Sequence, residues 1–284
     1  MPGQKLILGI VVIVVLLIMG IFLTPMRYAL FGMKGTVGFI GAHTTKSMED
    51  SSDVGYMRLR DYLANHGYEA KQIPTPTIRL PDLQAYDACI FFAPESALDQ
   101  DEIDAIHSYV EGGGGFLITG SGWAGERRGF SNNITRAWGF EYMNTKCYEP
   151  EQAYTDYGVS VSQYTVAALG LVEGNPIASR ITYPYVMRNS CTIEVTDPAK
   201  ASTAITLKDF AFGEHADHQD LKPNKDHGEP VGTDAVVMVN AEIGSGRVVG
   251  MGGNDLYMNK WLQQSKPAEN AKSMVFVLDW LTKQ

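Results

Sequence analysis

The chain has 284 residues, of which 45% are hydrophobic and 19% are charged, the composition of an ordinary globular protein. Its formal net charge is −9 and no Lys/Arg cluster offers phosphates a footprint, which argues against a nucleic-acid-binding protein. The three cysteines form no C-x-x-C pair, which excludes thiol-redox and zinc-ribbon motifs of that spacing.

Residues 1–30 contain an apolar segment long enough to cross a membrane. Leu6 to Leu23 reads LILGIVVIVVLLIMGIFL, eighteen residues without a charge, with Lys5 before it and Arg27 after it. At a rise of about 1.5 Å per residue, a helix of this length just spans a hydrocarbon core of about 30 Å. We therefore expect a retained anchor helix. A cleaved signal peptide is the alternative, but the apolar run is long and bulky residues follow it where a cleavage site needs small ones.

The segment after the anchor predicts alternating strands and helices. Residues 37–42 (VGFIGA) form a short apolar run typical of a strand. Apolar side chains spaced from Val54 to Leu63 predict an amphipathic helix that ends before Gly67. Residues 68–73 then predict a second strand, which prolines end.

The next strand–helix–strand unit is the clearest in the chain. Residues 88–93 (ACIFFA) fit a strand that is buried on both faces. Asp99 is placed to cap a helix, and Glu102 completes a capping-box pair three residues later. Glycines at 112–115 end this helix, and residues 116–119 (FLIT) predict the next buried strand.

This repetition predicts the fold class. Strand–helix–strand units pair their strands in parallel through right-handed crossovers. We expect an open, mostly parallel α/β sheet of the flavodoxin-like or amidotransferase-like kind, with helices on both faces. Ligands of such sheets bind beyond the carboxyl ends of the strands. Those ends are His43-Thr44, Pro94-Glu95-Ser96 and Gly120-Ser121-Gly122-Trp123.

The second half of the chain is richer in short strands, and we expect one α/β domain over residues 36–284 with a β-rich second half. A short helix from Asn132 to Phe140 is expected to end at Gly139, and apolar residues at 275–281 predict a C-terminal helix. The remaining expected elements are strands at 192–195, 203–207, 235–240 and 247–251, and a polar loop over 212–232.

Two stretches carry a resemblance to a known family. YDACIFFAPESALDQDEIDAIHSYVEGGGGFLITGSG resembles the core of class I glutamine amidotransferase-like domains, and in particular the non-catalytic GIFT or DUF4350-type domains of gliding-motility and intraflagellar-transport proteins. GSGRVVGMGGNDLYMNKWL is similar to that group's late strand-and-loop signature, and Asn175-Pro176-Ile177 resembles its His-Pro-Ile element. The resemblance covers residues 36–284 and implies the fold, with binding or scaffolding as the expected role.

The chain departs from the catalytic pattern of this family. The family's cysteine belongs in the turn after the FLIT-like strand, where this chain has Thr119, Gly120 and Ser121. Asn254-Asp255 stands where the family has a late His-x-Glu pair. Without a thiolate and a base, glutamine hydrolysis by that mechanism is unavailable. The resemblance therefore implies a catalytically inactive domain, an accessory component of a membrane assembly that binds a protein partner or a small polar ligand.

The expected ligand edge supplies the candidate binding residues. Trp123 with Arg127 and Arg128 can stack on and bind a sugar, a carboxylate or a partner protein, although a surface loop with ordinary packing is the alternative. No Walker-type loop or G-x-G-x-x-G stands where a nucleotide-binding domain needs it, so we expect no cofactor. The candidate ligand-binding residues are Thr44, Glu95, Ser121, Trp123, Arg127 and Asn254.

Two features suggest a membrane-surface hydrolase as the alternative function. Ser121 follows a strand, as the serine of a nucleophile elbow does. However, residues 119–123 read Thr-Gly-Ser-Gly-Trp, in which the glycines are not at the positions of the Gly-x-Ser-x-Gly motif. His215, His218 and His227 gather with aspartates in one segment and could ligate zinc. That segment lacks a helical pattern to fix the ligands, so a turn serine and a solvated loop are the favoured interpretations.

Three signals bear on the side of the membrane that the domain faces. The positive-inside rule gives little information on the orientation of the anchor, because cations flank both of its ends. Asn133 begins an N-x-T glycosylation sequon, and Cys147 and Cys191 lie in polar segments where they could pair in an oxidising compartment. With the usual topology of the resembling family, these signals predict a single-pass membrane protein whose domain is extracytoplasmic.

Overall fold

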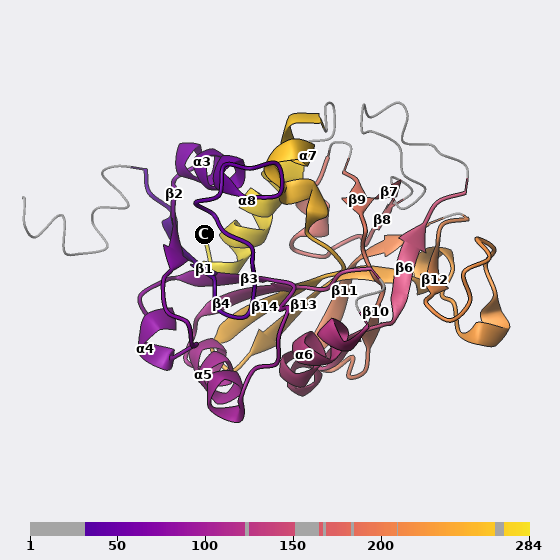
Figure 1. Ribbon diagram of the computed structural model, residues 1–284, viewed down its shortest axis with the longest axis horizontal. Helices are drawn as coiled ribbons and strands as arrows, with labels where there is room; N and C mark the ends of the chain where they lie inside the picture. The colour runs from indigo at the N-terminus through magenta and orange to yellow at the C-terminus, as the bar shows by residue number, and fades with distance from the viewer. Residues whose placement is uncertain are drawn as a thin grey trace, which may run out of the picture.

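The computed structural model describes residues 32–122, 125–150, 165–166, 169–182, 185–208, 210–264 and 270–284. Within these ranges the chain forms a ten-stranded sheet, two small two-stranded sheets, and helices on both faces of the large sheet (Figure 1). The expected anchor at residues 1–30 and Trp123 lie outside the described residues. No helix in the described ranges is long and apolar enough to span a bilayer.

The first half alternates strands and helices, as predicted. Its strands take the order β2-β1-β3-β4 and all pair in parallel, with Val37 opposite both Ala70 and Ala88. The elements are β1 (Gly35–Ile40), α3 (Met57–Asn65), β2 (Tyr68–Ile73), α4 (Leu80–Leu83), β3 (Ala88–Phe92), α5 (Gln100–Glu111) and β4 (Gly115–Thr119).

Helix α5 begins at the predicted capping box. The Asp99 carboxylate accepts a hydrogen bond from the backbone N–H of Glu102 at 2.9 Å. The Glu102 carboxylate accepts one from the backbone N–H of Asp99 at 3.0 Å. Two backbone donors that would lack partners at the first turn are thereby satisfied. The apolar stripe predicted for this helix is buried, and it consists of Ile103, Ile106, Tyr109 and Val110.

The second half makes the sheet mixed, which corrects the expectation of a mostly parallel sheet. Beyond β4 the order continues with β14 (Gly246–Met251), β13 (Val236–Ile243), β10 (Ile193–Val195) and β5 (Phe140–Tyr142), with β11 (Ala201–Leu207) beside β13 and β8 (Leu169–Leu171) beside β11. Four pairings in the described sheet are parallel and five are antiparallel. The direction reverses because β13 and β14 form a hairpin whose turn contains Gly244 at φ 58°.

The second half contains these elements: α6 (Glu126–Thr135), η1 (Arg136–Trp138), β5 (Phe140–Tyr142), β6 (Thr145–Tyr148), β7 (Thr165–Val166), β8 (Leu169–Leu171), η3 (Ala178–Arg180), β9 (Met187–Arg188), β10 (Ile193–Val195), β11 (Ala201–Leu207), β12 (Phe212–His215), η4 (Lys225–His227), η5 (Gly232–Asp234), β13 (Val236–Ile243), β14 (Gly246–Met251), η6 (Asp255–Tyr257), α7 (Asn259–Gln264) and α8 (Asn270–Leu281).

Two boundaries in this half differ from the prediction. The helix expected from Asn132 begins earlier, at Glu126, and continues through η1 to Gly139, which ends it in the left-handed conformation at φ 86°. The expected polar loop at 212–232 begins instead with β12, which pairs with β6. The strand forms because Phe212 is fully buried and its ring packs against Tyr148. This contact joins segments far apart in the sequence, so the local pattern does not predict it.

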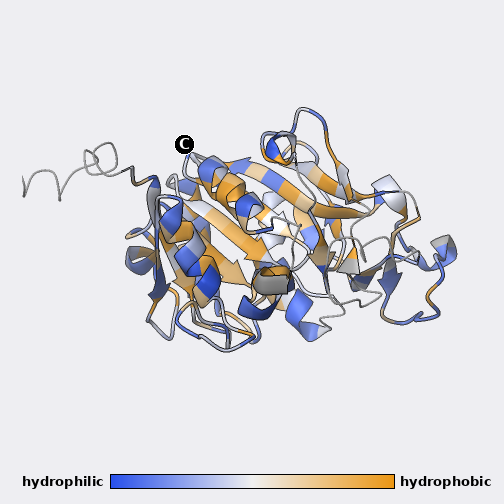
Figure 2. Cartoon of the chain, turned by 90° about the horizontal axis from the view of Figure 1, so that it is seen from above, coloured by the Kyte–Doolittle hydropathy of each residue, from blue (hydrophilic) through white to orange (hydrophobic). Residues whose placement is uncertain are grey.

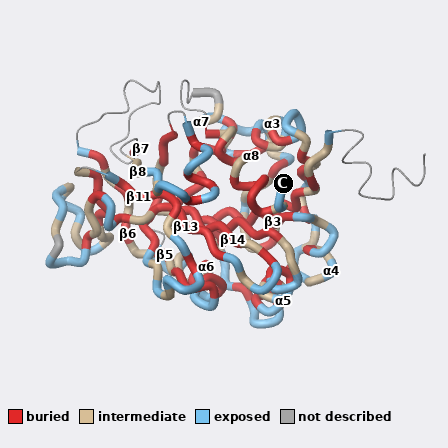
Figure 3. The backbone as a smooth tube through the Cα atoms, turned by 180° about the vertical axis from the view of Figure 1, so that it is seen from behind, coloured by how far each residue is buried: buried red, intermediate tan, exposed pale blue. Residues whose placement is uncertain are grey.

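The large sheet separates two hydrophobic cores. Helices α3, α7 and α8 lie on one face and α4, α5 and α6 on the other (Figure 1). The central strands between these layers, β1, β3, β4 and β14, are rich in hydrophobic residues and mostly buried, whereas β2, β8 and β10 are partly exposed (Figures 2 and 3). All residues of β3 and β4 are buried, because helices cover both faces of this part of the sheet. The polar groups that remain accessible therefore collect at the strand ends.

Candidate functional site

The carboxyl ends of β1, β3, β4 and β14 meet at one edge of the sheet, because these four strands run in parallel. The crevice there is bounded by four loops that follow them, residues 41–50, 93–98, 120–122 and 252–255. Arg127 and Arg128 of helix α6 line part of it, and Arg188 is near enough to Asp255 to interact with its charge. This is the edge at which open α/β sheets bind ligands.

Glycines hold the backbones after β4 and β14 in close contact. The Gly120 N–H donates to the Met251 carbonyl at 2.8 Å. A β-carbon at Gly120 would lie 2.6 Å from the Cys191 sulfur, and one at Gly252 would lie 2.0 Å from the Cys191 carbonyl oxygen. No larger side chain fits at position 120 without displacing its neighbours. Ser121 is therefore the first side chain available after β4.

Glu95 anchors the loop after β1. Its carboxylate accepts hydrogen bonds from the Thr45 N–H at 2.9 Å and the Thr45 hydroxyl at 2.8 Å, and it lies 3.5 Å from the Arg127 guanidinium. Burial alone would raise the pKa of Glu95, but these hydrogen bonds and the charges of Arg127 and Lys46 lower it. Thr44 shapes the same loop, since its hydroxyl accepts from the Lys46 N–H at 3.2 Å.

Lys46 and Asp255 form a half-buried pair of opposite charges in the crevice. Burial lowers the pKa of Lys46, and the negative charges of Asp255 and Glu95 oppose that shift. Burial raises the pKa of Asp255, and the positive charges of Lys46, Arg188 and Lys146 oppose it. Each group therefore favours the charged form of the other in a site partly withdrawn from water.

Asn254 precedes Asp255 and is almost fully buried. Its amide donates to the Tyr56 hydroxyl, and burial together with the charge of Asp255 holds the pKa of Tyr56 well above its usual range. Among the described residues the Asn254 carboxamide oxygen has no hydrogen-bond partner. Asn254, a candidate ligand contact from sequence, thus belongs to the floor of the crevice and not to its open surface.

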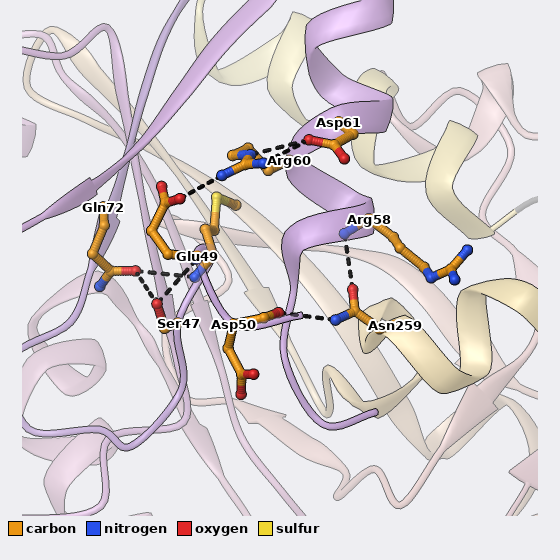
Figure 4. Close-up of polar contacts among 9 residues, drawn as sticks. Ser47, Glu49, Asp50, Arg58, Arg60, Asp61, Gln72 and Asn259 are labelled. Carbon is orange, nitrogen blue, oxygen red and sulfur yellow. Dashed lines mark hydrogen bonds and ion pairs between the residues drawn. The ribbon is translucent and has the colours of Figure 1, made fainter. Parts of the chain in front are cut away.

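The loop that carries Thr44 and Lys46 is held from three directions (Figure 4). Gln72 of β2 accepts from the Met48 N–H at 3.0 Å. Asn259 of α7 donates to the Asp50 carbonyl at 2.9 Å, and its own oxygen accepts from the Arg58 N–H at 2.8 Å. The loop is therefore tied to β2, α3 and α7, which fixes the side chains it presents to the crevice.

A small pocket opens where the loop after β4 faces α6. Ser121, Lys46 and the first turn of α6 all contribute to its lining. Within the described part of the chain, Arg128 has neither a hydrogen-bond partner nor an ion-pair partner. The lining residues are Lys46, Ala93, Pro94, Gly120, Ser121, Arg127, Arg128, Ser131 and Tyr142.

A hydrogen-bonded chain of three side chains, which sequence reasoning missed, lies beside the crevice. His43 Nδ1 is 3.0 Å from the Ser96 hydroxyl, and His43 Nε2 is 2.8 Å from the Glu102 carboxylate. His43 adopts φ 58°, a strained conformation for a residue with a side chain. Glu102 also accepts from the Ile78 N–H at 2.9 Å. The only sequence signal was that His43 and Ser96 follow neighbouring strands.

The His-rich segment is organised by a buried carboxylate. Glu229 accepts hydrogen bonds from the His215 N–H at 2.9 Å and the Asn224 N–H at 2.7 Å. The rings of His218 and His227 stack with their centroids 4.2 Å apart. Among the described residues, no group of three or more His, Cys, Asp or Glu side chains is placed to hold a metal ion. The alternative of a zinc site at His215, His218 and His227 gains no geometric support.

The three cysteines are buried free thiols, so the disulfide that the sequence left open between Cys147 and Cys191 is not formed in this structure. Cys147 packs in the core on one face of the sheet and Cys191 in the core on the other. Burial raises the pKa of Cys89 and of Cys191 to about 12 each, so neither supplies a thiolate near neutral pH.

Comparison with known proteins gives likeness of fold. No protein-family model and no curated protein matches the chain. It is similar to the structure of the mmIFT52 N-terminal domain, with TM-score 0.63 and 17% identity over 87% of this chain and 97% of that one. A thua-like protein from Parabacteroides merdae matches with TM-score 0.51 and 10% identity, over 87% of this chain and 90% of that one. Cytoplasmic protein STM1381 from Salmonella typhimurium matches with TM-score 0.51 and 12% identity, over 87% of this chain and 99% of that one.

Proposed function

We propose that this chain is a single-pass membrane protein whose extracytoplasmic amidotransferase-like domain, of the GIFT or DUF4350 type, is not an enzyme. It acts as a binding and accessory component of a membrane assembly. The observation that carries the proposal is the crevice at the carboxyl edge of the sheet. It presents a fixed set of charged side chains, including Lys46, Glu95 and Asp255, and no imidazole of the described residues is hydrogen-bonded to Ser121.

Among the described residues, no thiol and imidazole are paired at the site as in an amidotransferase centre, which supports a binding role. The described thiols are buried with raised pKa values. Gly120 leaves no room for a cysteine side chain, and His43 is engaged by Ser96 and Glu102. Charged groups held rigidly at a ligand edge, without a nucleophile, suit recognition better than covalent catalysis.

Capture of the full-length protein from native membranes in mild detergent, followed by mass spectrometry, tests this role. We expect reproducible partner subunits with the wild-type protein and their loss in a double variant of the crevice, Lys46→Gln with Arg127→Gln. The matched control is Arg79→Gln with Arg136→Gln, which removes two charges of the same sign from exposed ion pairs outside the crevice. Recovery of the protein without partners, or equal recovery from both variants, would contradict the proposal.

A hydrolase is the second candidate function, and the chain of Ser96, His43 and Glu102 is the observation that favours it. A carboxylate, an imidazole and an exposed serine hydroxyl in this order match the composition of a serine-hydrolase relay. The adjacent Glu95 N–H donates to the His43 carbonyl at 2.6 Å, so it is not available to stabilise an oxyanion. This engagement makes binding the better-supported function.

Labelling with a fluorophosphonate probe separates the two candidates. A hydrolase that uses this relay would be labelled at Ser96, and both Ser96→Ala and His43→Gln would abolish the labelling. Ser121→Ala serves as the control, since no described imidazole is hydrogen-bonded to Ser121. The proposed binding role predicts no labelling of the wild-type protein above that of denatured protein.

A further inference from the structure

The pocket between the loop after β4 and helix α6 concentrates positive charge. Lys46, Arg127 and Arg128 line it, and no carboxylate is among its described lining residues. The chain as a whole carries a formal net charge of −9, so this concentration is not the general character of the protein. Cations gathered in a hollow attract and hold anions more strongly than the same cations dispersed on a convex surface.

The carboxylates nearest the pocket do not neutralise it fully. Glu95 is engaged with Thr45 and with Arg127, and Asp255 interacts with Lys46. Arg128 is half-buried and has no ion-pair partner in the described ranges. A half-buried guanidinium without a carboxylate retains donors in the planar fork that matches a carboxylate or a phosphate.

Two further features of the pocket suit an anion. Ser121 and Ser131 add hydroxyl donors to its lining. Arg127 and Arg128 lie in the first turn of α6, where Gly125 is the N-cap and no side chain caps the backbone N–H groups. Glu126 is the acidic residue of this turn, and its side chain is exposed and not part of the pocket lining. The positive end of the helix dipole adds to the field of the side chains there.

We propose that the pocket formed by Lys46, Arg127 and Arg128, with Ser121 and Ser131, binds one oxyanionic group, a carboxylate or a phosphate, of a small ligand. The pocket is small, so the anionic group enters it and the rest of the ligand lies in the open crevice. This inference rests on the proposed binding role of the crevice and names the chemistry that it recognises. Arg128 is assigned as the main contact of the ligand's anionic group, because no carboxylate of the described residues is paired with it.

Titration of the full-length protein in detergent micelles with inorganic phosphate, and separately with acetate, tests the assignment. Ionic strength is held constant with potassium chloride, and both the heat of binding and the thermal unfolding midpoint are measured. We expect saturable binding of at least one anion. Arg128→Gln should weaken it about tenfold or more, because a charge-assisted hydrogen bond at a partly buried site is lost. Arg128→Lys, which keeps the charge without the planar fork, should weaken it less.

Arg136→Gln is the matched control, since it removes an exposed guanidinium from the other end of the same helical segment. Equal affinity in wild-type protein and Arg128→Gln, equal losses in both glutamine variants, or no saturation by either anion would overturn the assignment. Preference for phosphate over acetate identifies a phosphate group, and the reverse identifies a carboxylate. Partner capture is scored separately, so loss of anion binding with retained, crevice-dependent capture refutes this inference alone.

Discussion

At the scale of single residues, the buried carboxylate of Asp279 contacts two cations and a tyrosine hydroxyl. It accepts hydrogen bonds from Lys34 at 2.8 Å, from the Tyr68 hydroxyl at 2.7 Å and from Arg180 at 2.6 Å. Burial alone would raise the pKa of Asp279, but these partners lower it. The residue thereby joins α8 to the segment before β1, to β2 and to η3.

Asp279→Asn should lower the free energy of unfolding at pH 7 by about 2 kcal/mol, because charge-assisted hydrogen bonds to partly exposed cations are weakened. The folded-state pKa lies below the unfolded value of about 3.9, so the stabilisation is present above that pH and is lost as pH falls through the folded-state pKa. Urea unfolding at pH 7 and pH 3 measures this. The difference in the free energy of unfolding between wild type and Asp279→Asn should be smaller at pH 3 than at pH 7. The control is Asp61→Asn in an exposed ion pair, which should change the free energy of unfolding by less than about 0.5 kcal/mol at either pH.

Ser121→Cys places the thiol of the amidotransferase family in the turn after β4. We expect no glutaminase activity from this variant, because none of the described histidines is hydrogen-bonded at that position to act as a base. Ammonia release from glutamine by purified protein measures the outcome. Turnover above that of the wild-type protein would show that a base reaches the site after all and would weaken the assignment of a non-catalytic crevice.

At the scale of elements, the first turn of α5 connects helix capping to the loops around the site. Glu102 completes the capping box with Asp99 and also binds His43 and the backbone of Ile78. The loop after β1, the segment before α4 and the start of α5 therefore share one buried carboxylate. Burial alone would raise the pKa of Glu102, but these hydrogen bonds lower it.

Asp99→Ala should destabilise the protein by about 1 kcal/mol, because it removes the N-cap acceptor of α5. Asp101→Ala is the matched control, since this residue lies in the same first turn, is exposed and takes no part in the capping box. Asp101→Ala removes only the interaction of this carboxylate with the helix dipole, which should lower the free energy of unfolding by about 0.3–1 kcal/mol. Chemical denaturation of both variants measures the difference, and equal losses would assign the effect to the dipole and not to the cap.

At the scale of the whole molecule, the expected anchor decides where the domain acts. Eighteen uncharged residues from Leu6 to Leu23 are expected to hold the chain in the bilayer. We predict that the full-length protein stays in the membrane pellet after extraction with alkaline carbonate. Deletion of residues 1–30 should release it into the supernatant. Release by alkali of protein that still carries residues 1–30 would contradict a spanning segment, whereas release of a chain shortened at its N-terminus would favour a cleaved signal peptide.

The sequence predicted the parallel half of the sheet well because its signals are local. Capping residues, helical periodicity and buried runs lie within a few residues of the elements that they specify, as at Asp99 and Glu102. It also placed Thr44, Glu95, Ser121 and Arg127 at one edge, because the carboxyl ends of parallel strands must meet there. In the second half, the positions of β10, β11, β13 and β14 were close to the prediction, but their antiparallel pairing and the strand β12 were not predicted.

Tertiary structure decided the features that depend on distant partners. Strand β12 forms against β6, and β10 lies between β5 and β13, pairings that no local period encodes. The half-buried pair of Lys46 and Asp255 arises because loops about two hundred residues apart are brought together, and partial burial then shifts both pKa values. The sequence by itself determined the local elements of the first half and showed that the amidotransferase family's cysteine and His-x-Glu pair are absent at the matching positions. It also provides the expectation of a membrane-spanning segment. Folding alone determined which charges share the crevice, because burial and Coulomb interactions depend on distance in space and not on distance along the chain.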